Sequence, residues 1–367
     1  MSEPARLPLH EFHQRLGANF SALNGVEIVA DYGDASGESQ SLHETAGVLD
    51  LSFRSRVCLT GADRVRFLHG QVTNDVKKLR VGEGCYAALT TAKGKMQSDL
   101  NIFCLQEEVL LDFEPGLATV VTERLEKYIV ADDVQVVDVG PHYGLLSVQG
   151  PKSEAIVRAL ELFAEVPRAP LGSLKISDAI LGEIYLMNHA RLASSGFDLF
   201  VPAATLSAVA DKLFAAAKSF GGQACGWSAF EIARMEAGIP RYGVDMDESH
   251  LASECGIEAR GISYTKGCYI GQEVLNRIHS VGHVNRELRG LKLGPEETNL
   301  PARGAKLFQG DKEVGYLTSA GFSPRLKYVV ALGYVRREAF APGTELTLRS
   351  GGTECRATVA ALPFVRS

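Results

Sequence analysis

The chain has 367 residues and a mass of 39.5 kDa, more than one ordinary hydrophobic core holds, which indicates roughly two or three domains. Hydrophobic residues make up 46% and charged residues 22%, so the composition excludes a disordered chain. The formal net charge of −6, without any long run of Lys and Arg, argues against nucleic acid as a partner.

The N-terminal part mixes polar and apolar residues, and spacing predicts an amphipathic helix near Leu9–Phe20. A stretch rich in Gly, Ser and Asp at Asp31–Ser41 is typical of a loop. An alternating run at Ser55–Thr60 then predicts a strand, which Gly61 ends, and Arg64–Val72 has helical spacing. This part of the chain therefore contains a unit of strand, glycine turn and helix.

The same unit recurs after Tyr143, where an apolar strand ends at Gly150 and a helix follows. Two copies predict an internally duplicated α+β body. Further helices are expected at Ala203–Phe220 and Ser228–Ala237. From about Arg286 only short alternating segments remain, separated by Gly, Pro and Asp, which predicts a C-terminal antiparallel β-barrel.

No apolar run reaches the roughly 18–20 residues that cross a bilayer, and the N-terminus lacks an apolar signal core, so we expect no membrane partner and a cytoplasmic location. Seven scattered cysteines without a C-x-x-C pair favour free thiols over a disulfide framework. No phosphate-binding loop, zinc-protease or serine-hydrolase motif is present. His279 and His283 lack further ligands, so no metal site is predicted.

The segment Lys266-Gly-Cys-Tyr-Ile-Gly-Gln-Glu273 is the densest candidate for chemistry. Gly267 and Gly271 permit an open turn around Cys268, and the charge of Lys266 would favour its thiolate. The alternative is a small apolar side chain packed in a tight turn, as most free cysteines are.

Two further segments carry acids. Tyr86–Asp99 is expected to form a hairpin that turns at Lys93–Lys95, with Asp99 returning opposite Tyr86. An acid beside an aromatic ring suits a flat, nitrogen-rich ligand, although a solvated carboxylate at a strand end is the simpler alternative. Glu236 lies in the last turn of a helix, where the dipole disfavours an acid, so it serves either a ligand with paired N–H donors or an ion pair with Arg234 or Arg241.

The segment Lys266–Glu273 resembles the motif of the YgfZ family, which are folate-binding relatives of the glycine-cleavage T-protein (aminomethyltransferase). Further resemblances follow in the T-protein order along most of the chain. They are Ala46–Ser52, Phe67–Asp75, Glu236-Ala-Gly, Gly315–Ser319, Phe322-Ser-Pro and Pro363-Phe. One turn departs from the T-protein, because Arg191-Leu-Ala-Ser194 replaces Tyr-Thr-Gly-Glu.

The resemblance implies a T-protein-like fold of duplicated α/β units around a central folate cleft, followed by the barrel. It implies a first domain of residues 1–50 and 141–245, a second of residues 51–140 and 246–285, and a barrel of residues 286–367. Tetrahydrofolate or a one-carbon derivative is the implied ligand. Asp99 would face its reacting nitrogens, Tyr86 would line the pocket, and Glu236 would hold the pterin edge. The remaining expected contacts lie in the motif, at Lys266, Gly267, Tyr269, Gly271 and Gln272.

Three functions are compatible with this resemblance, the last of them a folate-regulated interaction module without chemistry. The first is a folate-binding accessory protein for the assembly or repair of iron–sulfur client proteins, with Cys268 as the key thiol, because the T-protein has no equivalent cysteine and its turn tyrosine is missing here. The alternative is a folate-dependent aminomethyltransferase, with Asp99 assisting cleavage of the N–C bond.

Overall fold

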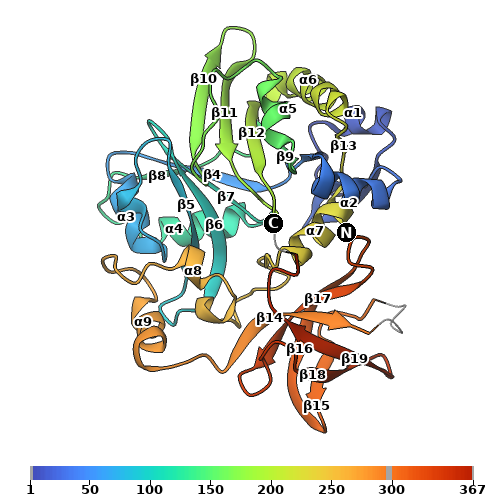
Figure 1. Ribbon diagram of the computed structural model, residues 1–367. Coiled ribbons are helices and arrows are strands. Elements are labelled where there is room, and N and C mark those ends of the chain that lie inside the picture. The colour runs from blue at the N-terminus through green and yellow to red at the C-terminus, as the bar shows by residue number, and fades with distance from the viewer. Residues whose placement is uncertain (1–2, 295–299, 366–367) are drawn as a thin grey trace.

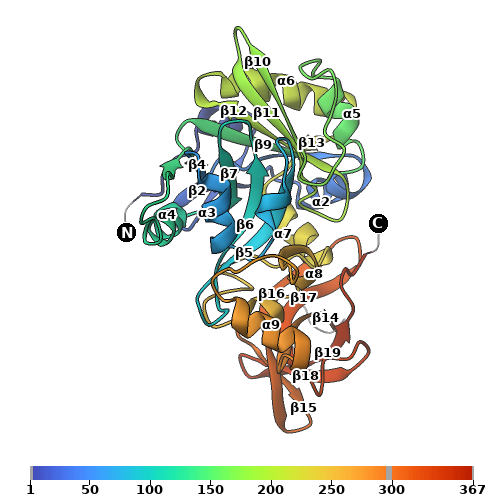
Figure 2. The same cartoon turned by 90° about the vertical axis from the view of Figure 1, so that its left-hand side faces the viewer.

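The computed structural model describes residues 3–294 and 300–365 and has an α+β fold with two large sheets, a small two-stranded sheet and a closed barrel (Figure 1). The barrel lies at one end of the molecule, and the two sheets lie together at the other (Figure 2). Among the described residues, no helix is long and apolar enough to span a membrane.

The first sheet gathers strands that are far apart in the sequence. Its order is β10-β11-β12-β9-β3-β13, antiparallel except for the parallel pair of β13 and β3. Two helices, α5 (Ser153–Arg158) and α6 (Leu206–Ser219), pack on it and bury one hydrophobic core. The strands are β3 (Gly47–Asp50), β9 (Tyr143–Gln149), β10 (Ser173–Asp178), β11 (Gly182–Asn188), β12 (Gly196–Pro202) and β13 (Gln223–Ala224).

The second sheet comes from one continuous stretch of chain, in the order β5-β6-β7-β4-β8. Its core lies beneath α3 (Arg64–Gln71) and α4 (Ala118–Glu126). The strands are β4 (Ser55–Thr60), β5 (Gly84–Thr90), β6 (Met96–Cys104), β7 (Val109–Phe113) and β8 (Gln135–Asp138).

The predicted duplication is visible as two strand–turn–helix units, β4 with α3 and β9 with α5. In each unit the turn glycine has a positive φ, +94° at Gly61 and +132° at Gly150. A Cβ would come within 2.2 Å of the Asp133 carbonyl oxygen at the first, and within 2.7 Å of the Thr45 carbonyl oxygen at the second. Only glycine fits either turn, so the repeat reflects a shared backbone requirement.

The C-terminal barrel closes in the order β14-β17-β16-β15-β18-β19, which confirms the predicted antiparallel barrel. Alternate residues of these strands point inward and form its own core. The strands are β14 (Arg286–Leu293), β15 (Lys306–Gln309), β16 (Lys312–Ser323), β17 (Tyr328–Arg336), β18 (Glu345–Ser350) and β19 (Thr353–Ala360).

The N-terminal part differs from the prediction in two ways. The first helix, α1, covers only His10–Arg15 and gives way to a hairpin of β1 (Asn19–Leu23) and β2 (Val26–Asp31). The segment expected to be a loop contains α2 (Ala35–Glu44), whose N-cap Asp34 accepts a hydrogen bond from the Gly37 N–H. Tertiary contacts stabilise this helix, because Glu38 is 1% exposed and accepts hydrogen bonds from the backbone N–H groups of Tyr32 and Gly226.

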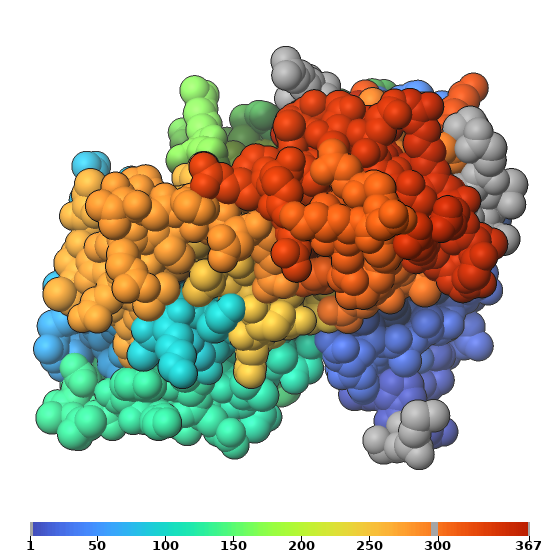
Figure 3. Space-filling model, turned by 90° about the horizontal axis from the view of Figure 1, so that it is seen from below, coloured from blue at the N-terminus to red at the C-terminus, as the bar shows by residue number. Residues whose placement is uncertain are grey.

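One helix, α7 (Trp227–Glu236), lies between the parts of the molecule, since it packs against α2, β2 and β16. The chain then passes through α8 (Glu258–Gly261) and α9 (Gln272–Val281) before it enters the barrel. Seen from below, this segment lies beside the barrel, and the β5–β6 hairpin reaches the surface next to it (Figure 3). Lys95 at the hairpin tip contacts Ser249 and Leu251. The domain bounds given above stay a prediction.

Candidate functional site

Asp99 and Tyr86 lie on the neighbouring strands β6 and β5. The register pairs Asp99 with Ala88 and Tyr86 with Asn101, so Asp99 is not directly opposite Tyr86 as predicted. The two side chains meet along the diagonal, where long side chains still reach each other. The Tyr86 hydroxyl donates a hydrogen bond of 2.9 Å to Oδ2 of Asp99.

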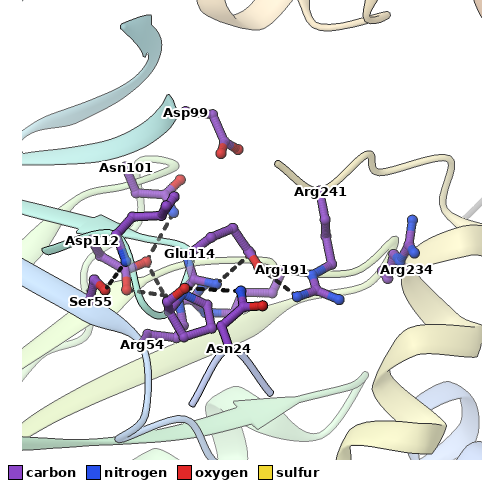
Figure 4. A network of polar contacts seen from close by, with 12 residues as sticks. Asn24, Arg54, Ser55, Asp99, Asn101, Asp112, Glu114, Arg191, Arg234 and Arg241 are labelled. Carbon is purple, nitrogen blue, oxygen red and sulfur yellow. Dashed lines mark hydrogen bonds and ion pairs between the residues drawn. The ribbon is translucent and has the colours of Figure 1, made fainter. Parts of the chain in front are cut away.

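The Asp99 carboxyl group is buried and only partly satisfied. Its Oδ1 atom has no hydrogen-bond partner among the described residues. Burial, and then the nearby Glu114 carboxylate, raises the pKa of Asp99 to about 6. Figure 4 shows this carboxylate set apart from the ion pairs around it. Asp99 can therefore hold or release a proton near neutral pH, as a general acid or base does.

A hollow of about 70 Å³ lies beside Asp99. It reaches both sheets, α7 and α8, so it is where the predicted central cleft would be. Arg260 of α8 lies over the ring of Tyr86, 4.2 Å from its centroid, and has no ion pair among the described residues. The other charged side chains at the wall are Arg54, Glu114, Arg191, Arg234 and Arg241.

Buried ion pairs form the floor of this hollow (Figure 4). Arg54 donates to Asp112 at 2.8 Å and to Glu114 at 2.9 Å, and Arg241 donates to Glu114 at 2.6 Å. Although burial alone would raise the pKa of Asp112, the guanidinium groups of Arg191 and Arg54 hold it below its usual range. The carboxylates of Asp112 and Glu114 are therefore ionised. Within the described part of the chain, Asp99 has no paired cation that would favour its ionised form.

Arg191 occupies the turn that departs from the T-protein pattern. Its guanidinium pairs with Asp112 at 2.9 Å and with Asp198 at 2.7 Å, and Asp198 also contacts His189 Nδ1 at 2.8 Å. Arg191 therefore ties the first sheet to the second. The Oγ atom of Ser194 in the same turn is buried without a hydrogen-bond partner among the described residues.

The ion pairs continue from the sheets to the barrel. Arg241 contacts Glu231 at 2.9 Å, Glu231 contacts Arg234 at 2.9 Å, and Arg234 contacts Asp245 at 2.5 Å. Asp245 accepts hydrogen bonds from the hydroxyls of Thr318 and Ser319 on β16. Sequence reasoning missed this network, although acids at 112 and 114 in the apolar run Val109–Glu114 were a signal for it.

The structure does not bring Glu236 to the hollow of Asp99. Glu236 is 1% exposed at the end of α7, where its Oε2 atom lies 2.7 Å from Nε2 of His43. Its Oε1 atom accepts a hydrogen bond from the Ser323 hydroxyl. The sequence left open an ion pair with Arg234 or Arg241, but neither contacts Glu236, and the basic side chain beside it is His43 of α2.

Lys266 is buried against the end of α3. Its Nζ donates to the carbonyl oxygens of His69, Val72 and Asn74 at 2.5, 2.7 and 2.8 Å. Burial lowers its pKa to about 8. The three carbonyl groups occupy all the protons of the ammonium group, so Lys266 anchors the segment and has no proton left to donate to Cys268; an effect of its charge on the thiolate stays a prediction.

Residues of the motif on both sides of Cys268 are packed against the protein, whereas the Cys268 thiol is exposed. Of the seven cysteines, all of which the structure describes, Cys268 is the exposed one. Gly271 has a φ of +94°, and a Cβ there would come within 2.6 Å of Thr90 Oγ1. Tyr269 is buried in the same hydrophobic cluster as Tyr86, and Gln272 opens α9. Gly267, Cys268 and Gln272 do not line the hollow of Asp99.

Among the described residues, no group of three or more His, Cys, Asp or Glu side chains is placed to hold a metal ion. His279 instead stacks on Tyr264, with ring centroids 3.7 Å apart.

Comparisons with known proteins identify the family. Residues 9–261 match the model of the GCVT N-terminal domain, and residues 286–366 match that of the glycine cleavage T-protein C-terminal barrel domain. Aminomethyltransferases of Saccharopolyspora erythraea and Symbiobacterium thermophilum are 27% and 28% identical, over 100% and 99% of this chain and 99% and 97% of theirs. The crystal structure of the glycine cleavage system aminomethyltransferase T from Bartonella henselae shares the fold, with a TM-score of 0.87, 24% identity and 98% of each chain covered. The chain belongs to the glycine cleavage T-protein family.

Proposed function

We propose that this chain binds tetrahydrofolate beside Asp99 and transfers an aminomethyl-derived one-carbon unit to it. The observation that carries the proposal is the buried Asp99 carboxyl group, held by Tyr86, with a pKa of about 6 and an unpartnered Oδ1 atom. The family supports it, because full-length relatives carry the name aminomethyltransferase. This favours the transferase over the iron–sulfur accessory role.

In this proposal Asp99 moves the proton. The Tyr86 hydroxyl holds Oδ2, which leaves Oδ1 directed to a nitrogen of the substrate. A carboxyl group with a pKa near 6 is largely ionised at neutral pH, so it can accept the proton of the attacking folate nitrogen and pass it to the amino group, which leaves as ammonia. The sulfur of the carrier leaves as the thiol with the proton of the second folate nitrogen. The fixed ion pairs below it supply a polar floor that does not reorganise during the reaction.

The hollow must open to admit this substrate. Its volume of about 70 Å³ is well below the roughly 300–1,000 Å³ of pockets that bind organic ligands. Arg260 is the side chain most able to move, because it is exposed and its cation–π contact with Tyr86 is its main interaction. A flat ring that stacks on Tyr86 would displace the guanidinium group, which then faces the ligand.

The test compares binding with transfer. Tetrahydrofolate is titrated into wild type, Asp99→Asn and the control Asp311→Asn, which changes an exposed acid on the barrel. Transfer is then assayed with an aminomethylated lipoyl carrier. We expect Asp99→Asn to bind within about fivefold of wild type but to lose about 10²-fold or more in rate. The proposal fails if wild type binds no folate, or if Asp99→Asn transfers at the wild-type rate.

A second candidate is the folate-binding accessory protein for iron–sulfur enzymes, and one observation favours it. Cys268 is exposed on a pinned turn that lies outside the hollow, so transfer alone gives it no role. Under this candidate Cys268→Ser keeps folate binding but lowers the activity of iron–sulfur client enzymes in cells. The second candidate would be favoured over the first by two results together. Wild type would bind folate without transferring an aminomethyl group, and Cys268→Ser would lower the activity of the iron–sulfur client enzymes.

A further inference from the structure

A second hollow, of about 350 Å³, lies between α2 and the turn that joins β16 to β17. It is separate from the hollow of Asp99 and shares no lining residue with it. Its wall is mostly polar and comes from two distant parts of the chain. The lining residues are Ser36, Ser39, Gln40, His43, Glu44, Pro324 and Arg325.

Ser39 contributes a buried hydroxyl without a partner. The residue is 2% exposed, and its Oγ atom has no hydrogen-bond partner among the described residues. Leaving such a group unpaired in the interior is unfavourable. A serine in a helix can satisfy its hydroxyl on the preceding turn, and Ser39 does not do so. Its proton is therefore available to an acceptor inside the hollow.

Arg325 contributes a cation whose only polar partner is a neutral ring. Its Nη1 atom lies 3.2 Å from Nδ1 of His43, and it has no carboxylate partner among the described residues. A guanidinium group cannot accept a hydrogen bond, so Nδ1 of His43 is the acceptor. The ring proton is then on Nε2, which faces Glu236 at 2.7 Å. An anion would bind Arg325 more strongly than this imidazole does.

The charges around the hollow leave room for an anion. Ser36, Ser39 and His43 lie on one face of α2, at the spacing of successive helical turns. The acid on the wall, Glu44, is exposed and already accepts a hydrogen bond of 2.8 Å from the Gln40 amide. The other nearby acid, Glu236, is engaged with His43 and Ser323.

We propose that this hollow is a binding site for a small molecule bearing one oxyanion group, a phosphate or a carboxylate. Arg325 donates to the oxyanion from the barrel, and the hydroxyls of Ser39 and Ser36 donate from α2. His43 forms the inner wall, with Glu236 in contact behind it. The site joins α2 to the barrel and does not depend on folate binding, so it survives if the function proposed above fails.

The test is calorimetric titration of the full chain with orthophosphate and, separately, with acetate at constant ionic strength. These two probes distinguish a phosphate from a carboxylate ligand. We expect wild type to bind at least one of them, with Kd raised about tenfold or more in Arg325→Gln and about threefold or more in Ser39→Ala. The matched control is Lys327→Gln, which removes an exposed cation from the same turn but does not line the hollow, and it should change Kd less than about twofold.

Three results would overturn the proposal. The first is that neither anion binds to folded wild type, and the second is that Arg325→Gln and Ser39→Ala bind as tightly as wild type does. The third is that Lys327→Gln weakens binding as much as Arg325→Gln, which would indicate charge attraction without a site. Circular dichroism melting of each variant shows that it is folded. Tetrahydrofolate affinity serves as an independent measurement and should be unchanged in Arg325→Gln, because Arg325 does not line the hollow of Asp99.

Discussion

Asp99 carries its carboxyl group at a half-buried position beside the hollow, and this gives a pH dependence to stability. Its pKa is about 6 in the folded chain against an ordinary value of 3.8. The native state therefore holds this proton more tightly, and the stability that the protonated form contributes is lost as pH rises from about 4 through about 6. We expect Asp99→Asn to be about 2 kcal/mol more stable than wild type at pH 7.5, with a smaller gain at pH 4. Urea unfolding at both values checks this, and an equal gain at both would contradict it.

Cys268 is distinguished from the other thiols by its exposure. Burial raises the pKa of Cys255 to about 12, and Cys58 and Cys225 are shifted in the same direction. We expect iodoacetamide to label Cys268 at least about tenfold faster than these three in the folded chain at pH 7.5. Mass spectrometry measures each rate, and unfolding in urea should remove the difference. If Cys268 is among the slowest thiols of the folded chain, it is a packing residue.

At the scale of an element, α3 depends on a side chain from a distant segment. The Lys266 ammonium group satisfies three backbone carbonyl groups at the end of this helix. Lys266→Met leaves the His69 and Val72 carbonyls without this donor, while the Asn74 carbonyl keeps the Val76 N–H, so we expect a loss of about 2 kcal/mol and faster hydrogen exchange in the last turn of α3. The control Lys77→Met, at an exposed position nearby, should change stability by less than about 0.5 kcal/mol. Equal stability of the two variants would show that water replaces the ammonium group.

At the scale of the whole molecule, buried ion pairs connect both sheets, α7 and the barrel. Asp245→Asn leaves Arg234, 1% exposed, without its closest counter-charge, and we expect a loss of about 3–5 kcal/mol. Because the pair is buried, this loss should differ little between about 0.05 and 0.5 M NaCl in urea unfolding. The exposed pair of Lys312 and Glu338 supplies the control, since Lys312→Met should cost less than about 0.5 kcal/mol. A loss that shrinks strongly with salt would contradict this account.

The features that sequence predicted are those encoded locally. The alternation of apolar and polar residues, in segments separated by Gly and Pro, predicted the barrel strands. Gly61 and Gly150 identified the two copies of the repeated unit, because neither turn has room for a Cβ atom. What depends on distant partners was missed. The helix α2 forms in a stretch rich in Gly and Ser because Glu38 bonds to segments far along the chain.

The candidate site shows the same division. Tyr86 and Asp99 share a hairpin, so their proximity was predictable, but a shift between Leu89 and Thr90 moved their register. Glu236 was weighed only against cations close to it in the sequence, whereas His43 lies on another helix. The arginines around Asp99 come from four separate segments, and no local pattern could bring them together.

The order of strands along the chain sets an order for assembly during synthesis. All strands of the second sheet lie within residues 55–138, so this sheet can be complete while later residues are still being made. The first sheet cannot, because β3 pairs with β9 and with β13, and β13 follows only at Gln223. Strand β3 is therefore without a partner until β9 has been made at Gln149, and it keeps one open edge until translation passes Ala224. A nascent chain arrested between residues 140 and 149 would combine a completed second sheet with a fully unpaired apolar strand, so this is the interval in which we expect chaperone binding to matter most.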